Sequence, residues 1–318
     1  MVAGHYPVML EEAVEALALS GGDTVVDATF GGGGHTRRIL EELGPEGRVI
    51  GIDWDPGAAE RASRLVEEDR RFTFKAGAYD EVLVDLVEEG ARADAILFDL
   101  GLSSYQIDEA GRGFSYVREG PLDMRMDPSR GESAADFLNS AGEAEITQVL
   151  VRYGDVPRGE ARRVAKAILQ RRPLRTTLEL SEAVRSAVGW KERSGNPAKR
   201  VFQAVRVYVN DELDGLERAL GAAERLLVPG GRLVAITFHS GEDRVVKRFI
   251  SERAGRCVCP PELPVCVCGA RPGFRKGVVK RPSSREIEEN PRSASARLRS
   301  AVRTSEPLEA DRSLEGFS

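Results

Sequence analysis

The sequence has no long apolar run, no basic segment at its N-terminus and only four cysteines. None of its 318 residues lies in an uncharged apolar stretch approaching 18 residues, and acids already occur at Glu11 and Glu12. These absences disfavour a membrane-spanning helix and a signal peptide. We therefore expect a cytoplasmic globular protein that makes no membrane contact. With 41% hydrophobic residues, the chain is long enough for a sizeable core, arranged as two structural units.

The four cysteines lie close together in the C-terminal part of the chain. Cys257, Cys259, Cys266 and Cys268 form a C-x-C-x₆-C-x-C pattern. Disulfides are disfavoured in a cytoplasmic protein. Four thiolates at this separation suit a structural zinc ion, although each pair is spaced more tightly than the usual C-x₂-C. A structural metal site and free or redox-labile thiols both stay open, and we assign no metal ligand and no catalytic role here.

The net charge of −5 conceals two basic segments. Residues 150–206 carry 14 Lys and Arg against 5 Asp and Glu, and residues 271–303 carry 10 against 3. The rest of the chain is therefore strongly acidic. Each segment alone fits an ordinary solvated face. Together they favour a polyanionic partner, whose phosphates the cations would neutralise.

A glycine-rich segment lies between an expected strand at 24–26 and an expected helix at 37–43. It reads Asp-Ala-Thr-Phe-Gly-Gly-Gly-Gly-His over residues 27–35. Successive glycines let a backbone approach a ligand closely, and the start of the next helix offers unpaired N–H groups. The next expected strand ends at Asp53, about 20 residues on, the spacing at which a carboxylate can bind ribose hydroxyls. The pattern indicates a cofactor that contains a nucleoside.

The glycine spacing lacks the pattern of a nicotinamide site, because Thr36 stands where the last glycine of G-x-G-x-x-G is needed. Acids instead follow successive expected strands, at Asp27, Asp53 and Asp99. A Leu-x-Pro-Gly-Gly turn at 227–231 precedes a late strand, which is typical of enzymes that use S-adenosylmethionine (SAM). Each Asp alone could equally be a helix cap. Their recurrence at strand ends, where open α/β sheets bind ligands, favours SAM.

The alternation of strands and helices holds from residue 22 to about 102 and resumes near 210. Between these points, apolar residues recur at helical spacing, as at Ile146, Val149 and Leu150. We predict a discontinuous cofactor domain formed by residues 1–107 and 208–303. Residues 108–207 form an inserted helical domain for substrate recognition, and residues 304–318 form a polar, acidic tail.

Ordered motifs along the chain are more specific than the glycine loop. The chain resembles the bacterial small-subunit ribosomal RNA methyltransferase H family, of the MraW type, over roughly residues 4–303. The motifs that carry the resemblance lie at residues 5–10, 27–36, 99–108, 112–115, 120–127, 202–206, 209–213 and 239–244. The sequence departs from the family pattern at Gly241, where Leu is usual, and at 153–157. Both departures concern the substrate side.

The resemblance implies an α/β class I SAM-dependent methyltransferase, with a mostly parallel Rossmann-like sheet and an inserted helical domain. It implies that SAM contacts Gly33, Gly34, His35, Asp53, Tyr79, Asp99 and Gln106. For His35, a helix-capping role is the alternative to a cofactor contact. The implied partner is small-subunit ribosomal RNA within the 30S subunit, and we count a homodimer among the assemblies to test.

The implied reaction is transfer of a methyl group to the exocyclic N4 amine of a cytidine. The amine is a weak nucleophile, so an acceptor near its N–H would help. Asp99 and, after it, His239 are the catalytic candidates. Asp99-Leu100-Gly101-Leu102 lacks the acid-Pro-Pro-aromatic motif of DNA amino-methyltransferases, which disfavours that alternative. A non-catalytic RNA-binding or assembly protein that binds SAM is the other alternative.

Overall fold

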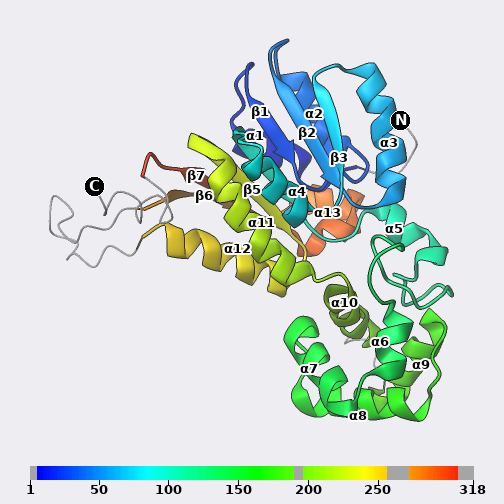
Figure 1. Ribbon diagram of the computed structural model, residues 1–318. Coiled ribbons are helices and arrows are strands. Elements are labelled where there is room, and N and C mark those ends of the chain that lie inside the picture. The colour runs from blue at the N-terminus through cyan, green and yellow to red at the C-terminus, as the bar shows by residue number, and fades with distance from the viewer. Residues whose placement is uncertain (1–5, 190–195, 256–271, 307–318) are drawn as a thin grey trace, which may run out of the picture. The chain divides into compact units, whose positions relative to one another are not determined.

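A computed structural model describes residues 6–189, 196–255 and 272–306 (Figure 1). The chain divides into two compact units. Met1–Gly101 and Asp214–Ser318 form one, the sheet unit, and Leu102–Leu213 form the other, the helical unit. The insertion is therefore six residues longer at each end than the 108–207 segment taken from the sequence.

Seven strands among the described residues form one sheet in the order β3-β2-β1-β4-β5-β7-β6. Five neighbouring strands, β3 to β5 in this order, are parallel, and β7 pairs antiparallel with both β5 and β6. The mostly parallel class I fold expected from the resemblance is thus confirmed. The strands are β1 (Thr24–Asp27), β2 (Arg48–Asp53), β3 (Phe72–Ala76), β4 (Ala93–Asp99), β5 (Leu227–Thr237), β6 (Phe274–Lys280) and β7 (Arg297–Arg303).

Helices cover both faces of the sheet. One buried cluster joins α1 (Leu10–Leu17), α2 (Gly34–Glu42) and α3 (Pro56–Glu68) to alternate residues of the central strands, among them Ala95 and Leu97. Side chains alternate along a strand, so Ile96 and Phe98 face the other way. That side carries α4 (Tyr79–Glu88), α11 (Glu212–Leu226) and α12 (Ser240–Arg253), as Figure 1 shows. The short α13 (Ser284–Glu289) precedes β7.

The parallel strands bring their last residues to one edge of the sheet. Asp27 ends β1, Asp53 ends β2 and Asp99 ends β4. Each is followed by a loop that enters a helix. The carboxyl edge of an open α/β sheet is where such folds bind ligands, so three acids are available there.

The helical unit is built from six described helices. They are α5 (Ser104–Asp108), α6 (Ala134–Ser140), α7 (Glu143–Gly154), α8 (Arg158–Gln170), α9 (Thr177–Val188) and α10 (Ala198–Val209). Ile146, Val149 and Leu150 are buried on α7, as the helical spacing predicts. No helix in the described ranges is long and apolar enough to cross a membrane.

Candidate active site

The glycine loop has left-handed backbone at Gly31, with φ of 53°, and at Gly33, with φ of 76°. A Cβ atom at Gly33 would lie 2.7 Å from Cζ of Phe30, and one at Gly34 would overlap Pro7. Both glycines are therefore required by packing within the sheet unit. Their proposed contact with SAM stays a prediction that this packing neither needs nor opposes.

The same loop is bonded to the strand-end acids on both of its sides. The N–H of Gly31 donates to Oδ2 of Asp53 at 2.7 Å, and the N–H of Asp55 donates to Oδ1 at 2.9 Å. On the other side, the backbone N–H of Asp99 donates to Oγ1 of Thr29 at 2.6 Å. The structure thus brings Asp53, Asp99 and the glycine loop together.

Asp27 orders the glycine loop through two hydrogen bonds. Its Oδ2 accepts the hydroxyl of Thr36 at 2.6 Å, and its Oδ1 accepts the N–H of Thr29 at 3.2 Å. Burial raises the pKa of Asp27 to about 6, although these hydrogen bonds lower it. Thr36, fully buried, therefore has a structural purpose at the position where a nicotinamide site needs glycine. Sequence patterns marked the missing glycine there but not the hydroxyl bond.

His35, near the start of α2, is 5% exposed and lies against Asp99. Its Nδ1 is 3.5 Å from Oδ2 of Asp99, and its Nε2 is 3.2 Å from the carbonyl oxygen of Val8. Burial lowers the pKa of His35 to about 4, which keeps the ring neutral at neutral pH. The ring binds the chain before α1 rather than capping its own helix.

The site is electrostatically negative. Burial raises the pKa of Asp53 to about 6, so this carboxyl is largely ionised at neutral pH. Burial, with the negative charges of Asp27 and Glu242, raises the pKa of Asp99 well above its usual range. The Oδ1 atom of Asp99 is buried and has no hydrogen-bond partner among the described residues. A cationic ligand beside these acids would relieve their mutual repulsion.

Tyr79 and Gln106 lie in different units. Tyr79 begins α4, just after β3, and its ring meets that of Phe98 edge to face with centroids 5.9 Å apart. Phe98 precedes Asp99 on β4, and neighbouring side chains of a strand face opposite sides, so this contact places Tyr79 on the α4 side of the sheet near the end of β4. Gln106 belongs to α5 of the helical unit, where its Oε1 accepts the N–H of Ser103 at 3.0 Å in a capping box. Its predicted contact with SAM stays untested.

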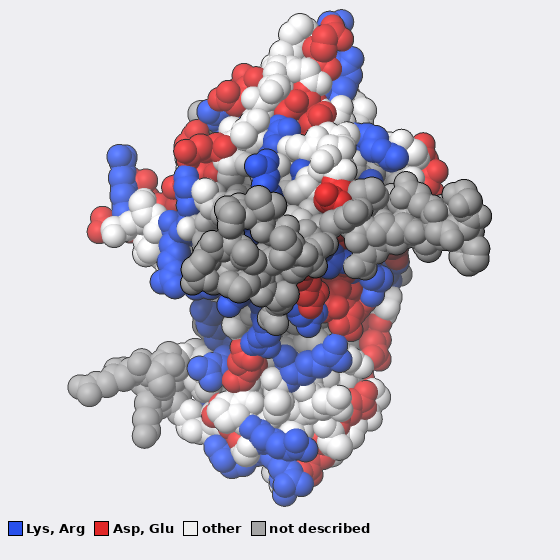
Figure 2. Space-filling view, turned by 90° about the vertical axis from the view of Figure 1, so that its left-hand side faces the viewer, with Lys and Arg blue, Asp and Glu red and all other residues white. Residues whose placement is uncertain are grey.

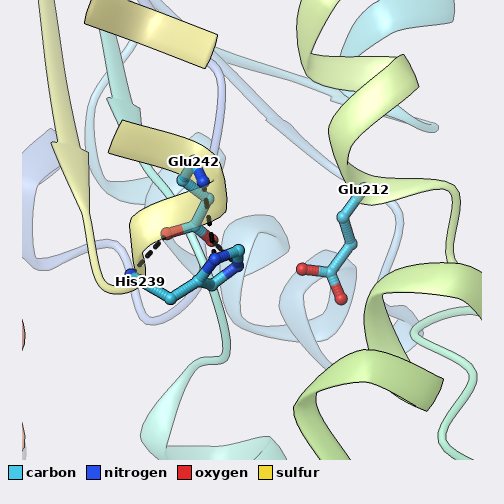
Figure 3. A group of neighbouring side chains, drawn as sticks. All are labelled: Glu212, His239 and Glu242. Atoms are coloured by element: carbon cyan, nitrogen blue, oxygen red, sulfur yellow. Dashed lines mark hydrogen bonds and ion pairs between the residues drawn. The ribbon is translucent and has the colours of Figure 1, made fainter. Parts of the chain in front are cut away.

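His239 caps α12 through its side chain (Figure 3). The N–H groups of Gly241 and Glu242 donate to its Nδ1 at 3.2 and 3.4 Å, so Nε2 carries the ring proton. That nitrogen lies 3.1 Å from Oε1 of Glu242, whose Oε2 accepts the N–H of Phe238 at 2.7 Å. The Nδ1 atom of His239 thus bonds the helix end, whereas its Nε2 is buried and has no hydrogen-bond partner among the described residues. Its catalytic role stays a prediction, and the geometry favours a structural one.

Glu242 is a buried residue of this site that motif reasoning passed over. It is 2% exposed and contributes to the raised pKa of Asp99. A carboxylate three residues after an N-cap is the capping-box spacing, and that was the signal available. Glu212, also drawn in Figure 3, belongs to the helical unit and forms an ion pair with Arg206 at 2.7 Å.

The second basic segment is partly neutralised within the sheet unit. Asp243 accepts hydrogen bonds from Arg297 at 2.8 Å and from Arg299 at 2.7 Å, which fastens α12 to β7. Fewer of its cations are therefore available to a partner than the sequence count indicates. Cys257, Cys259, Cys266 and Cys268 lie outside the described residues.

Comparisons with known proteins identify the family of the chain. The profile of the MraW methylase family matches residues 2–304. A protein of Rubrobacter xylanophilus named ribosomal RNA small subunit methyltransferase H is 74% identical over 305 residues, which cover 96% of this chain and 97% of that protein. A Heliobacterium modesticaldum protein of the same name is 45% identical, covering 95% of this chain and 99% of its own.

Among solved structures, a putative rRNA methylase of Clostridium thermocellum is similar with a TM-score of 0.43 and 13% identity, covering 96% of this chain and 99% of its own. A similarity at that level adds no weight to the assignment. The profile and the sequence relatives span nearly the whole chain. The chain therefore belongs to the MraW methylase family, and it is a SAM-dependent methyltransferase of the class I fold.

Proposed function

We propose that this protein methylates the exocyclic N4 amine of a cytidine in small-subunit (16S) ribosomal RNA, by direct in-line transfer. The relatives' names support ribosomal RNA as the substrate. The observation that carries the choice of an amine is the Asp99 carboxyl, which ends β4 with one buried oxygen free of partners among the described residues. A carboxyl there can accept an N–H from an incoming base.

The carboxyl edge of the sheet fits the methyl donor. When bound, SAM supplies an activated methyl on a cationic sulfur. Gly33, Gly34 and His35 would hold it through the backbone of the loop. Asp53 retains lone pairs for ribose hydroxyls, because each of its oxygens accepts one N–H. The ring of Tyr79, a half-buried residue, would pack on adenine, and Asp99 and Gln106 would complete the site.

The test is transfer of labelled methyl from SAM to 30S subunits, to free small-subunit RNA and to duplex DNA, followed by nucleoside analysis. We expect label in N4-methylcytidine from RNA. Label in DNA would favour a DNA amino-methyltransferase, and label in another nucleoside would overturn the N4 assignment. Measurable SAM binding with no transfer to any substrate would favour a non-catalytic RNA-binding protein.

The cytoplasmic location, the 30S context and the homodimer stay predictions. Comparing initial rates on 30S subunits and on free RNA tests the second, because an assembled substrate holds the target in one conformation. Sedimentation at micromolar concentration tests the third.

The helical unit offers cations for RNA. Figure 2 shows Lys and Arg side chains grouped on this unit, at the foot of the view. Arg158, Arg162 and Lys166 are exposed at i, i+4 and i+8 on α8, one stripe of the helix surface. Arg162 lies 3.9 Å from Glu143, at the limit of an ion pair. We infer that this stripe, hereafter the α8 stripe, contacts RNA phosphates.

Reversing the α8 stripe with Arg158→Glu, Arg162→Glu and Lys166→Glu should raise KM for RNA at least about tenfold near 0.1 M salt, with Kd for SAM unchanged. The slope of log affinity against log salt should flatten by roughly 0.7 for each phosphate that the protein no longer neutralises. The matched control reverses Arg64, Arg70 and Arg92, which are exposed in the sheet unit. Equal effects of the two triple variants would refute a specific role for the stripe.

A further inference from the structure

His35 has a tautomer fixed by its surroundings. Its Nε2 lies 3.2 Å from the carbonyl oxygen of Val8, which can only accept, so Nε2 must carry a proton. In the neutral ring, Nδ1 then has a lone pair. That lone pair faces Oδ2 of Asp99 at 3.5 Å. A carboxylate would repel it, whereas a protonated carboxyl would donate to it.

The other oxygen of Asp99 agrees with a protonated carboxyl. Oδ1 is buried and has no partner among the described residues, while the Asp99 side chain as a whole is 24% exposed. An ionised oxygen buried in this way carries a large desolvation penalty, while a neutral carbonyl oxygen carries a smaller one. A proton on Oδ2 would lie toward Nδ1, which is 3.5 Å away, at the outer limit of a hydrogen bond.

The charged groups around this pair act in the same direction. Asp27 at the end of β1 and Glu242 on α12 both disfavour a negative charge on Asp99. Asp53 lies across the glycine loop and is itself ionised only above about pH 6. A cation bound nearer to Asp99 than to His35 reverses the balance, because it favours the carboxylate more than it disfavours the imidazolium.

We propose that His35 is the internal base for Asp99: the single proton between Oδ2 and Nδ1 lies on the carboxyl in the free protein and moves to the imidazole when the cationic methyl donor binds. The O–H bond of Asp99 breaks, an N–H bond forms on His35, and no proton leaves the protein. His35 thereby acts through Asp99 as a positioning residue. It leaves an ionised carboxylate ready to accept from the amine, a use that rests on the proposed function.

The first test is histidine ¹⁵N NMR on the whole protein, with and without SAM and without RNA. The chain has only three histidines, so His5→Gln and His239→Asn variants assign the signals. We expect His35 as the neutral Nε2–H tautomer in the free protein and as an imidazolium with SAM bound. A ring that stays neutral in the complex, or is already charged without SAM, overturns the proposal. Neither reading depends on methyl transfer.

The second test counts protons released on SAM binding, by calorimetry in buffers of different ionisation enthalpy. Above about pH 7, where Asp27 and Asp53 are already ionised, wild type should release close to none. His35→Gln keeps a donor for the Val8 carbonyl and His35→Asn keeps a polar atom toward Asp99, but neither amide can take the proton. In both variants SAM binding should release up to about one proton, and affinity should rise with pH by up to about tenfold per unit until Asp99 is ionised in the free protein.

Adding Asp99→Asn to either variant should abolish the dependence of SAM affinity on pH that comes from Asp99. Only the pH dependence due to Asp27 and Asp53, near pH 6, should remain. A structural role limited to the Val8 bond predicts instead that His35→Gln behaves as wild type. Equal proton release by wild type and His35→Gln would likewise contradict proton transfer from Asp99 to His35. Methyl transfer by wild type, measured separately, shows whether the function stands when this inference fails.

Discussion

Asp99→Asn should lower kcat for methyl transfer by about 10²- to 10⁴-fold. The amide keeps the size of the side chain and an acceptor oxygen, but it cannot take the proton that the amine loses. Burial and the charges of Asp27 and Glu242 raise the pKa of this carboxyl, which makes it a stronger base than an ordinary aspartate once it is ionised. Single-turnover transfer of labelled methyl at saturating SAM measures the effect.

Asp94→Asn is the matched control, since Asp94 lies on the same strand near its opposite end. Its Oδ2 accepts the N–H of Thr24 at 2.8 Å, and an asparagine oxygen preserves that bond. The control should retain activity within about threefold, because the substitution keeps the hydrogen bond to Thr24 and lies away from the carboxyl edge of the sheet. Should Asp99→Asn transfer methyl at the rate of the control, the proton acceptor lies elsewhere.

The acids of the site were predictable because each follows a local strand pattern. Asp27, Asp53 and Asp99 end β1, β2 and β4 as expected, and parallel pairing then places them on one edge. Which atoms they bind was not predictable. The bond between Thr36 and Asp27 and the contact between His35 and Asp99 depend on how the loop folds back over the strand ends.

Long-range packing explains the glycines that the sequence assigned to ligand approach. Gly34 is required because Pro7 lies against it, and Pro7 is distant along the chain. A run of glycines indicates that another group lies too close for a side chain, but it does not indicate which atom that group contributes. The same spacing therefore fits a cofactor and a neighbouring side chain equally well.

The sequence of the antiparallel edge strand of the sheet does not show the alternating pattern that predicts a strand. β6 reads Phe-Arg-Lys-Gly-Val-Val-Lys, with charges and a glycine where an alternating strand pattern is expected. It is an edge strand that pairs with β7, and the pairing shifts register between Lys276 and Val279. Exposed edge strands need no apolar alternation, so the sequence marked this stretch only as part of the basic segment at 271–303. The capping role of His239 was hidden likewise, because histidine is an uncommon N-cap.

Asp53→Ala should weaken SAM binding by about 100-fold or more. The carboxylate accepts the N–H groups of Gly31 and Asp55, so it orders the glycine loop as well as offering oxygens to the ribose. Hydrogen bonds to a charged group contribute about 1.5–3 kcal/mol each, and about 1.4 kcal/mol corresponds to tenfold in affinity. Calorimetry gives Kd, and thermal unfolding checks that the fold survives. The Asp94→Asn protein is again the control.

The pH dependence of binding separates the two tasks of Asp53. Burial raises the pKa of Asp53 to about 6 in the free protein, and bonding to ribose hydroxyls stabilises the ionised form. Affinity should therefore be constant above about pH 7 and fall by up to about tenfold per unit below pH 6. Asparagine does not titrate, so in Asp53→Asn the part of the pH dependence of SAM affinity that comes from residue 53 should vanish. The affinity itself should stay low at every pH. An unchanged pH profile in Asp53→Asn would mean that Asp53 orders the loop without accepting from the cofactor.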